Sequence, residues 1–224
     1  MIKKFIPSIF YVMLWVYCDH PLNAQTLELL GGISNNHFFD YGSESGHYQS
    51  SYTDGIGYAI GLGYDFPMDS FWVRLTLLYE SYSGNVEASD GGLGGGTLTK
   101  ADINKDVIAL TFFPVNINIK KRIWINAGFE ASVLTQERLK GTTQYWTLGQ
   151  PTIIKDLNEV YSSFSSSFQI GIRLRFAYTI LLSPSVMLTP QYSFYYGLTN
   201  EFKEFPEITK SYRHYLLIGI GKKM

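Results

Sequence analysis

The side chains that could bind a metal ion lie near the N-terminal end of the chain. His37 and His47 flank Asp40 and Glu44, and imidazole and carboxylate groups are common protein ligands of zinc and related metals. The spacing matches no recognised ligand pattern, and solvated side chains in an exposed loop are the simpler interpretation. We therefore expect no metal site and no cofactor.

A second arrangement could support nucleophilic catalysis. His214 lies close to Ser211 in the sequence, and some lipid hydrolases use a histidine as general base and a serine as nucleophile. The sequence offers neither a third residue to orient the histidine nor donors for an oxyanion. We interpret His214 as an interfacial histidine among aromatic side chains and predict that the chain is not an enzyme.

Binding of nucleotides or nucleic acids is not indicated. The glycine-rich segment from Asp90 to Gly96 lacks both the Gly-Lys-Ser/Thr sequence and the strand-and-helix context of a phosphate-binding loop, and we interpret it as a flexible loop. The net charge is −1, and the longest basic run is 120–122. A nucleic-acid partner would normally require a basic patch.

The elements that must position these residues are β-strands. In residues 54–66, DGIGYAIGLGYDF, small residues alternate with bulky apolar ones, which places the two kinds on opposite faces of a strand. The strands are longer than those of soluble sheets and suit a tilted membrane crossing. Similar alternation predicts eight strands, at 26–37, 54–66, 71–83, 105–119, 123–137, 163–178, 186–198 and 211–223.

The connections between these strands alternate in length. Short turns at 67–70, 120–122 and 181–185 separate long polar segments at 38–53, 84–104, 138–162 and 199–210. Long external loops and short periplasmic turns are typical of outer-membrane barrels. The sequence therefore predicts an all-β fold, an eight-stranded antiparallel up-and-down transmembrane β-barrel over residues 25–224, with both termini in the periplasm.

The second face of the predicted strands carries balanced charges. A filled barrel interior requires such balance, because an unpaired buried charge costs several kcal/mol. Glu130 and Arg173 fall on adjacent strands at similar depth, and the small residues of 54–66 leave room for long side chains. The predicted lumen charge network consists of Glu28, Asp65, Arg74, Glu80, Glu130, Arg173, Arg175 and Arg213. If the apolar face pointed inward instead, the chain would be a soluble secreted lipid-binding barrel.

Residues 1–24 read as a signal peptide, with a basic start, an apolar stretch and a small residue, Ala24, before the expected cleavage site. The apolar stretch is too short to span a membrane as a helix. Cys18 is the only cysteine, and the bulky Tyr17 before it argues against a lipoprotein signal. Disulfides are therefore not expected.

One long connection has the composition of a contact surface. The segment 138–162 carries Tyr145, Trp146, Ile153 and Ile154, and exposed aromatic and aliphatic side chains are typical of protein interfaces. They could equally fold back onto the barrel rim.

Several features together resemble a known family. They are the Ala24-Gln25 junction, the pattern GIGYAIGLGYDF, the four long connections and the closing residues 215–221, YLLIGIG. Over residues 25–224 the chain resembles the OmpA/OmpX-like outer-membrane barrels and, more closely, the PorT-like β-barrel proteins of Bacteroidetes. The resemblance implies an outer-membrane location in a Gram-negative cell. The PorT-like group includes a protein needed for a dedicated secretion system, but most of its members have no assigned role. The C-terminal Lys222-Lys223-Met224 departs from the aromatic end of many such barrels.

We predict a structural or interaction role in the outer membrane. The long external segments would make surface contacts, or the barrel would be the membrane part of a secretion or envelope assembly. The expected partners are outer-membrane lipid and a protein of such a complex. The alternatives are a lipid-modifying enzyme at the external rim and the soluble lipid-binding barrel.

Overall fold

The chain forms β-strands throughout most of the part that the computed structural model describes, which is residues 25–41, 48–68, 71–120, 122–160, 164–203 and 208–224. No helix in these ranges is long and apolar enough to cross a membrane. The strands are β1 (Thr26–Asp40), β2 (Tyr48–Thr53), β3 (Gly55–Met68), β4 (Phe71–Gly92), β5 (Gly95–Ile119), β6 (Ile123–Thr147), β7 (Ile153–Val160), β8 (Phe168–Tyr178), β9 (Ile180–Leu181), β10 (Val186–Gly197) and β11 (Thr209–Lys223).

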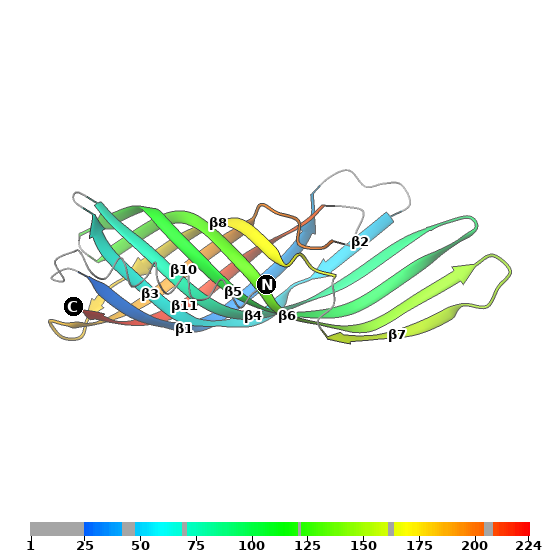
Figure 1. Cartoon of the computed structure of the whole chain (residues 1–224), viewed down its shortest axis with the longest axis horizontal. Coiled ribbons are helices and arrows are strands. Elements are labelled where there is room, and N and C mark those ends of the chain that lie inside the picture. The colour runs from blue at the N-terminus through cyan, green and yellow to red at the C-terminus, as the bar shows by residue number, and fades with distance from the viewer. Residues whose placement is uncertain (1–24, 42–47, 69–70, 121, 161–163, 204–207) are drawn as a thin grey trace, which may run out of the picture.

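Within these described ranges, eight strands close into a ring. They pair antiparallel in the order β11-β1-β3-β4-β5-β6-β8-β10, and pairing of β10 with β11 completes the circle. The backbone N–H of Met224 donates to the carbonyl of Gln25 at 2.9 Å, so the two ends of the described chain meet at one end of the barrel. Figure 1 shows the ring from the side. The predicted transmembrane barrel is confirmed.

The side-chain pattern explains why the ring forms. Along β8, exposed and buried residues alternate at every position, because successive side chains of a strand point to opposite faces. Ile170, Ile172 and Leu174 point outward, whereas Arg173 and Arg175 are buried inside. Along β8 the barrel wall therefore has the outward apolar face of a membrane protein and a charged inner face, which is the reverse of what a soluble lipid-binding barrel needs.

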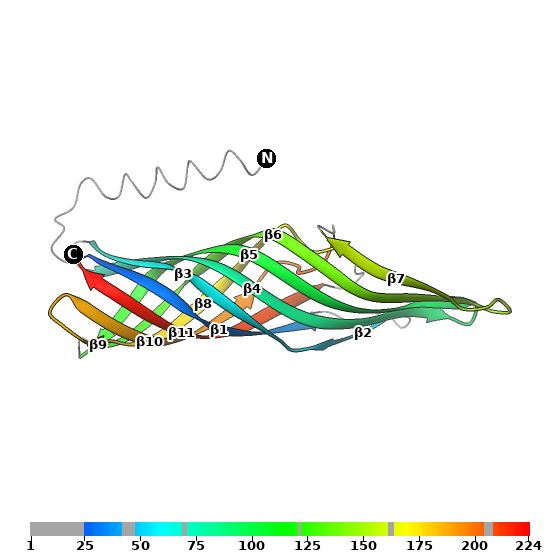
Figure 2. The same cartoon turned by 90° about the horizontal axis from the view of Figure 1, so that it is seen from below.

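Three of the strands extend far beyond the ring. β4 has 22 residues, and β5 and β6 have 25 each. β2 pairs with β4, and β7 pairs with β6, so the sheet order in this region is β2-β4-β5-β6-β7. Figures 1 and 2 show this sheet continuing the long axis of the barrel on the side opposite the C-terminus. We call residues 48–53, 82–105 and 138–160 the extension.

The extension corrects the prediction of long loops. Segments 84–104 and 138–162 were expected to be connections, but strands occupy most of the first and, in the second, residues 138–147 and 153–160. Much of 38–53 is also strand. Buried and exposed side chains alternate along these segments, as they do along the barrel strands. Val86 and Ile103 are buried, whereas their neighbours Asn85 and Asp102 are exposed. Polar residues on the exposed face had suggested loops.

The glycine-rich segment is a tight hairpin turn and not the flexible loop that was predicted. Gly91 faces Gly96 and Gly92 faces Gly95 across the β4–β5 pair, and Gly95 has a φ of 151°, which a residue with a side chain rarely adopts. A Cβ atom on Gly96 would lie 2.6 Å from Cζ2 of Trp146. The glycines thus allow both the turn and close packing of the indole.

An apolar cluster fills the space where the barrel meets the extension. Phe202 packs between Phe38 and Phe164, at ring centroid distances of 5.1 Å and 4.9 Å, and Ile103 and Leu139 of the extension belong to the same cluster. Phe164 was expected inside a predicted strand, 163–178. It belongs to the preceding connection instead, because β8 begins at Phe168, and it is buried there.

Candidate functional site

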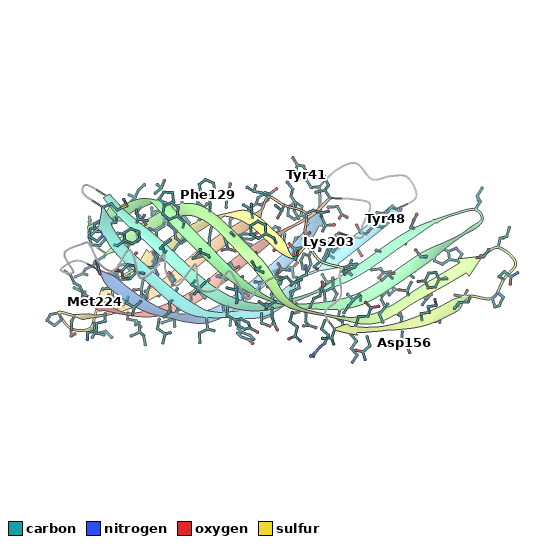
Figure 3. All side chains as sticks on the ribbon, in the orientation of Figure 1. Tyr41, Tyr48, Phe129, Asp156, Lys203 and Met224 are labelled. Carbon is teal, nitrogen blue, oxygen red and sulfur yellow. The ribbon has the colours of Figure 1, made fainter. Side chains whose placement is uncertain are left out.

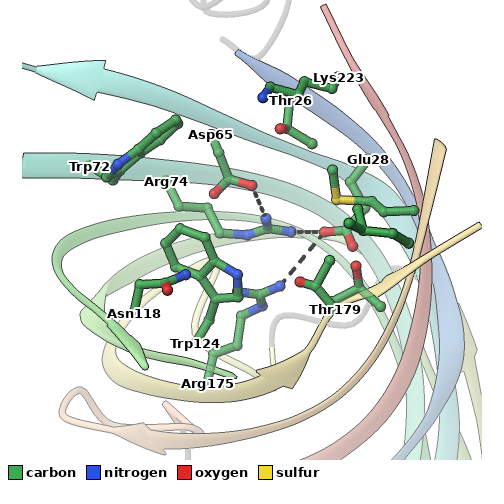
Figure 4. A pocket seen from close by; sticks show the side chains of 13 residues that line it. Thr26, Glu28, Asp65, Trp72, Arg74, Asn118, Trp124, Arg175, Thr179 and Lys223 are labelled. Atoms are coloured by element: carbon green, nitrogen blue, oxygen red, sulfur yellow. Dashed lines mark hydrogen bonds and ion pairs between the residues drawn. The ribbon is translucent and has the colours of Figure 1, made fainter. Parts of the chain in front are cut away.

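The barrel interior contains a layered set of ion pairs. In the layer near the chain ends, Arg74 binds Glu28 and donates to Asp65 at 2.7 Å. Arg175 donates to Asn126 at 2.6 Å and lies 3.7 Å from the Glu28 carboxylate. Glu28, Asp65, Arg74 and Arg175 line a cavity of about 510 Å³, into which they point from different strands (Figure 4).

The middle layer is centred on one carboxylate. Glu80 accepts hydrogen bonds from Arg213 at 2.6 Å and from the Tyr215 hydroxyl at 2.8 Å, and Arg173 lies 3.3 Å away. Arg173 also binds Glu130 at 2.5 Å. The guanidinium carbon of Arg173 lies 4.0 Å from the centre of the Tyr215 ring, so this arginine has both carboxylate and aromatic neighbours.

A third layer lies toward the extension, and sequence reasoning missed it. Lys105 binds Glu201 at 2.7 Å, and the Ser211 hydroxyl donates to Glu201 at 3.0 Å. The ammonium group of Lys105 also lies 4.4 Å from the centre of the Phe202 ring. Lys105 lies on the inward parity of its predicted strand, which could have revealed it. Glu201 lies in a predicted loop, where no periodicity indicates burial.

The connection that carries Glu201 brings it into an electropositive environment. Burial raises the pKa of this carboxyl, but Lys105 and Arg213 lower it by more, so that its pKa lies below the ordinary value. Glu201 is therefore ionised at neutral pH.

The buried charges of the described residues balance. The structure places all eight side chains of the predicted lumen network inside the barrel, with Asp65 the most exposed of them. The five fully buried acids are Glu28, Glu80, Glu130, Glu137 and Glu201, and the five buried bases are Arg74, Lys105, Arg173, Arg175 and Arg213. An eight-stranded barrel is just wide enough for side chains to fill, and paired charges occupy this one apart from the cavity near its Met224 end.

Of the residues considered for metal binding, the structure describes His37 and Asp40, and these two have different partners. His37 binds Asp54, and its ring stacks on Tyr212 at 4.7 Å. Asp40 instead accepts hydrogen bonds from the hydroxyl groups of Tyr52 and Thr209, at 2.7 Å and 3.0 Å. Glu44 and His47 lie outside the described residues. No cluster of three or more potential ligands occurs in the described ranges.

The candidate catalytic pair is separated by the barrel wall. Ser211 is buried on the inner face and donates to Glu201, whereas His214 lies on the outer face. The His214 Nδ1 atom lies 2.6 Å from the Tyr192 hydroxyl, and its ring lies 5.2 Å from that of Phe194. The histidine is part of an aromatic cluster, and the serine cannot reach it.

The predicted contact residues lie on strands and not on a loop, which is a correction. Tyr145 and Trp146 are near the end of β6, and Ile153 and Ile154 begin β7. Adjacent residues of a strand point to opposite faces, so each face of the extension receives one aromatic and one isoleucine side chain. Ile153 and Ile154 are 58% and 60% exposed. Figure 3 shows side chains projecting from both faces of the extension.

Two further apolar residues at the tips of the extension were not predicted. Leu93 and Leu148 occupy the β4–β5 and β6–β7 turns, and both are highly exposed. The backbone N–H of Leu148 donates to the carbonyl of Gly94 at 3.0 Å, which joins the two turns. The far end of the extension is therefore an apolar tip made by two adjoining hairpins.

Comparison with known families decides the identity of this architecture. Residues 23–203 match the family described as outer membrane protein beta-barrel domain. The chain belongs to this outer-membrane barrel family. A comparison with curated protein sequences gives no significant match.

Solved structures similar to this barrel protein come from several bacteria. Neisserial surface protein A is 12% identical, with 88% of this chain and 97% of that chain covered and a TM-score of 0.41. OprG from Pseudomonas aeruginosa is 14% identical, with 90% and 97% covered and a TM-score of 0.41. Ail of Yersinia pestis, solved with the heparin analogue sucrose octasulfate, is 8% identical, with 88% and 99% covered and a TM-score of 0.41. Likenesses of this size carry no functional argument.

Proposed function

We propose that this outer-membrane protein makes surface contacts through its extension, which the barrel anchors and holds upright. The observation that carries the proposal is the apolar tip, since Leu93, Leu148, Ile153 and Ile154 are all exposed at the end of a rigid sheet. Exposed apolar clusters on a rigid scaffold are typical of interaction sites.

The closed interior supports a contact role over transport. Three layers of ion pairs and the apolar cluster at the mouth lie across the lumen, and the cavity of about 510 Å³ is confined to the layer near Met224. Steady ion conduction is not expected through such an interior. The separation of Ser211 from His214 likewise supports a non-enzymatic role over lipid hydrolysis.

The orientation of the barrel is part of the proposal. The barrel end that carries the chain ends would face the periplasm, and the extension would project from the cell, as long segments do in outer-membrane barrels. Residues 1–24, the predicted signal peptide, lie outside the described residues. Membership of the PorT-like group of Bacteroidetes and a part in a secretion assembly stay predictions, as does the protein partner that they imply.

The test replaces residues 143–154 with a short Gly/Ser link in the native host. We expect the barrel to stay folded, as judged by its heat-modifiable migration on gels, while cells lose attachment to one another and to wells coated with fibrinogen or mucin. His214→Ala is the control, because it changes a half-buried aromatic cluster on the outer face of the barrel wall, away from the extension, and it should leave attachment unchanged.

The outcomes separate the candidate functions. Normal attachment after the replacement would refute the contact role. A silent replacement combined with lost protein secretion in the deletion strain would favour the secretion assembly. Loss of function in His214→Ala alone would favour chemistry at the rim.

A further inference from the structure

One long edge of the extension is an unpaired strand. β7 hydrogen-bonds to β6 along one side, from Arg138 paired with Val160 to Tyr145 paired with Ile153. In the ranges that the structure describes, no strand pairs with its other side. All of its residues are exposed except Leu157, which is half-buried. Figure 3 shows Asp156 of β7 at the lower border of the molecule.

An edge of this kind is a template for another strand. Its outward backbone N–H and C=O groups are free to form the hydrogen bonds of one more β-strand, and proteins with such edges usually cover them, shorten them or charge them heavily. β7 is eight residues long, and its sequence is IIKDLNEV. The edge therefore offers a row of backbone hydrogen bonds as well as side chains that could select a partner.

The order of charged residues along β7 is complementary to that of a second, antiparallel copy of β7. Consider two copies of β7 that pair antiparallel about a two-fold axis normal to the sheet. Residues that face each other point to the same side of the sheet, so their numbers are both odd or both even. Each possible register therefore has one central residue, which faces its own copy. A centre at Leu157 places Lys155 opposite Glu159 twice, and opposite charges facing each other across strands are stabilising. A centre at Lys155 or Asp156 would instead oppose like charges.

The second face of the strand favours the same register. With Leu157 at the centre, Ile154 faces Val160, and Asp156 faces Asn158, whose amide can donate to the carboxylate. A centre at Asn158 would oppose Asp156 to Val160, which leaves the charge without a polar partner.

The symmetry also fixes how the two molecules are oriented. A two-fold axis normal to the sheet reverses every direction within the sheet plane. The extension continues the long axis of the barrel (Figures 1 and 2), so the two barrels lie at opposite ends of the pair. They therefore cannot occupy the same membrane, and each must sit in a membrane that faces the other.

We propose that copies of this protein in two facing outer membranes join edge to edge through β7, in the register centred on Leu157. The proposal rests on the surface-contact function and names its partner as a second copy of the chain. Backbone hydrogen bonds between the two edges supply the adhesion, and the paired Lys155 and Glu159 supply the selectivity.

The test uses the full chain reconstituted at equal density into phosphatidylcholine/phosphatidylglycerol vesicles, with clustering followed by dynamic light scattering. Wild-type vesicles should cluster. K155E and E159K should each slow clustering about tenfold, because each replaces attractive cross-strand pairs with repulsive ones.

Mixing the two single variants should restore the attraction. When K155E vesicles meet E159K vesicles, the new carboxylate at position 155 of one copy faces the new ammonium group at position 159 of the other. The unchanged Glu159 and Lys155 of the two copies also face each other. About half of all vesicle encounters in an equal mixture join unlike variants, so clustering should recover to about half of the wild-type rate. The double variant K155E/E159K should recover the wild-type rate alone, because each copy then carries both exchanged charges.

Controls separate the edge from general charge effects and from misfolding. K100E makes the same charge change on an inner strand, where Lys100 pairs with Glu87, and it should cluster as wild type does. Recovery by mixing also shows that each single variant is folded, and gel heat-modifiability checks this independently.

Several results would overturn the proposal. They are wild-type vesicles that stay dispersed, single variants that cluster normally, and a mixture of the two variants that fails to recover. Chemical cross-linking of β7 within isolated vesicles, without clustering between them, would mean pairing within one membrane and would also overturn it. If the charge variants are silent while replacement of 143–154 still abolishes cell attachment, the contact function stands and the self-pairing falls.

Discussion

Replacing Glu80 by glutamine tests whether the ion pairs of the lumen hold the barrel together. The side chain is fully buried and interacts with Arg213, Arg173 and the Tyr215 hydroxyl. Glutamine keeps nearly the same volume and can accept a hydrogen bond, but it removes the negative charge. Two buried arginines then share the remaining carboxylate, that of Glu130.

The expected cost follows from the burial of these groups. Removing one partner of a buried ion pair costs about 3–5 kcal/mol, because the remaining charge stays in a medium of low polarity. At a urea slope of about 2 kcal/mol/M, this corresponds to a midpoint shift of about 1.5–2.5 M. An exposed pair of similar length costs about 1 kcal/mol or less.

The protein itself supplies the matched control. Glu87 and Lys100 pair at 2.8 Å on the extension, with side chains 48% and 55% exposed, so Glu87→Gln should shift the midpoint only slightly. Unfolding in detergent would be followed by tryptophan fluorescence and gel migration. If Glu80→Gln and Glu87→Gln shift the midpoint equally, the interior is hydrated, and the argument for a closed lumen fails.

Four other measurements follow from the structure. Because the pKa of Glu201 is lower in the folded than in the unfolded state, its ion pair stabilises the fold above the unfolded value of 4.5, and this stabilisation is lost as pH falls through the folded value. Glu201→Gln should flatten the loss of stability as the pH falls below 4.5, and an unchanged profile would contradict this. Gly171→Ala should destabilise the barrel, because its Cβ would meet the buried Tyr195 ring, whereas Gly31→Ala, with nothing within 4 Å, should be neutral. Planar bilayers containing the protein should show no steady conductance, and a stable open level would refute the filled lumen. N-terminal sequencing of protein from the outer membrane should begin at Gln25, and a start at Met1 would refute cleavage.

The inner face of the barrel was predictable because the period of a strand is fixed. Arg173 and Arg175 lie on the strand face opposite Ile172 and Leu174. Because the apolar face meets lipid, the two arginines must point into the barrel. The same rule extends to Lys105, which the sequence reasoning left out although its parity is that of the buried positions. The inner charges follow from the outer apolar residues and need no motif of their own.

The extension was not predictable in the same way. A strand that leaves the membrane no longer needs an apolar outer face, so its polar residues resemble those of a loop. Threonines such as Thr97 and Thr99 favour strands, but glycines nearby suggested flexibility. The burial of Glu201 could not be predicted for a different reason, since it depends on a connection that folds back into the barrel mouth.

The ion pairs of the lumen have a consequence for how the barrel assembles. Glu80 on β4 finds its partners 93 and 133 residues away in the chain, on β8 and β11. Contacts between such distant segments form late, because a long loop must close first. Hairpins that have already entered the membrane therefore carry unneutralised charges until the last strand meets the first. The ring closes and the charges are neutralised in the same step. An open sheet is therefore less stable than the closed barrel by the cost of its unpaired charges, and this difference favours closure.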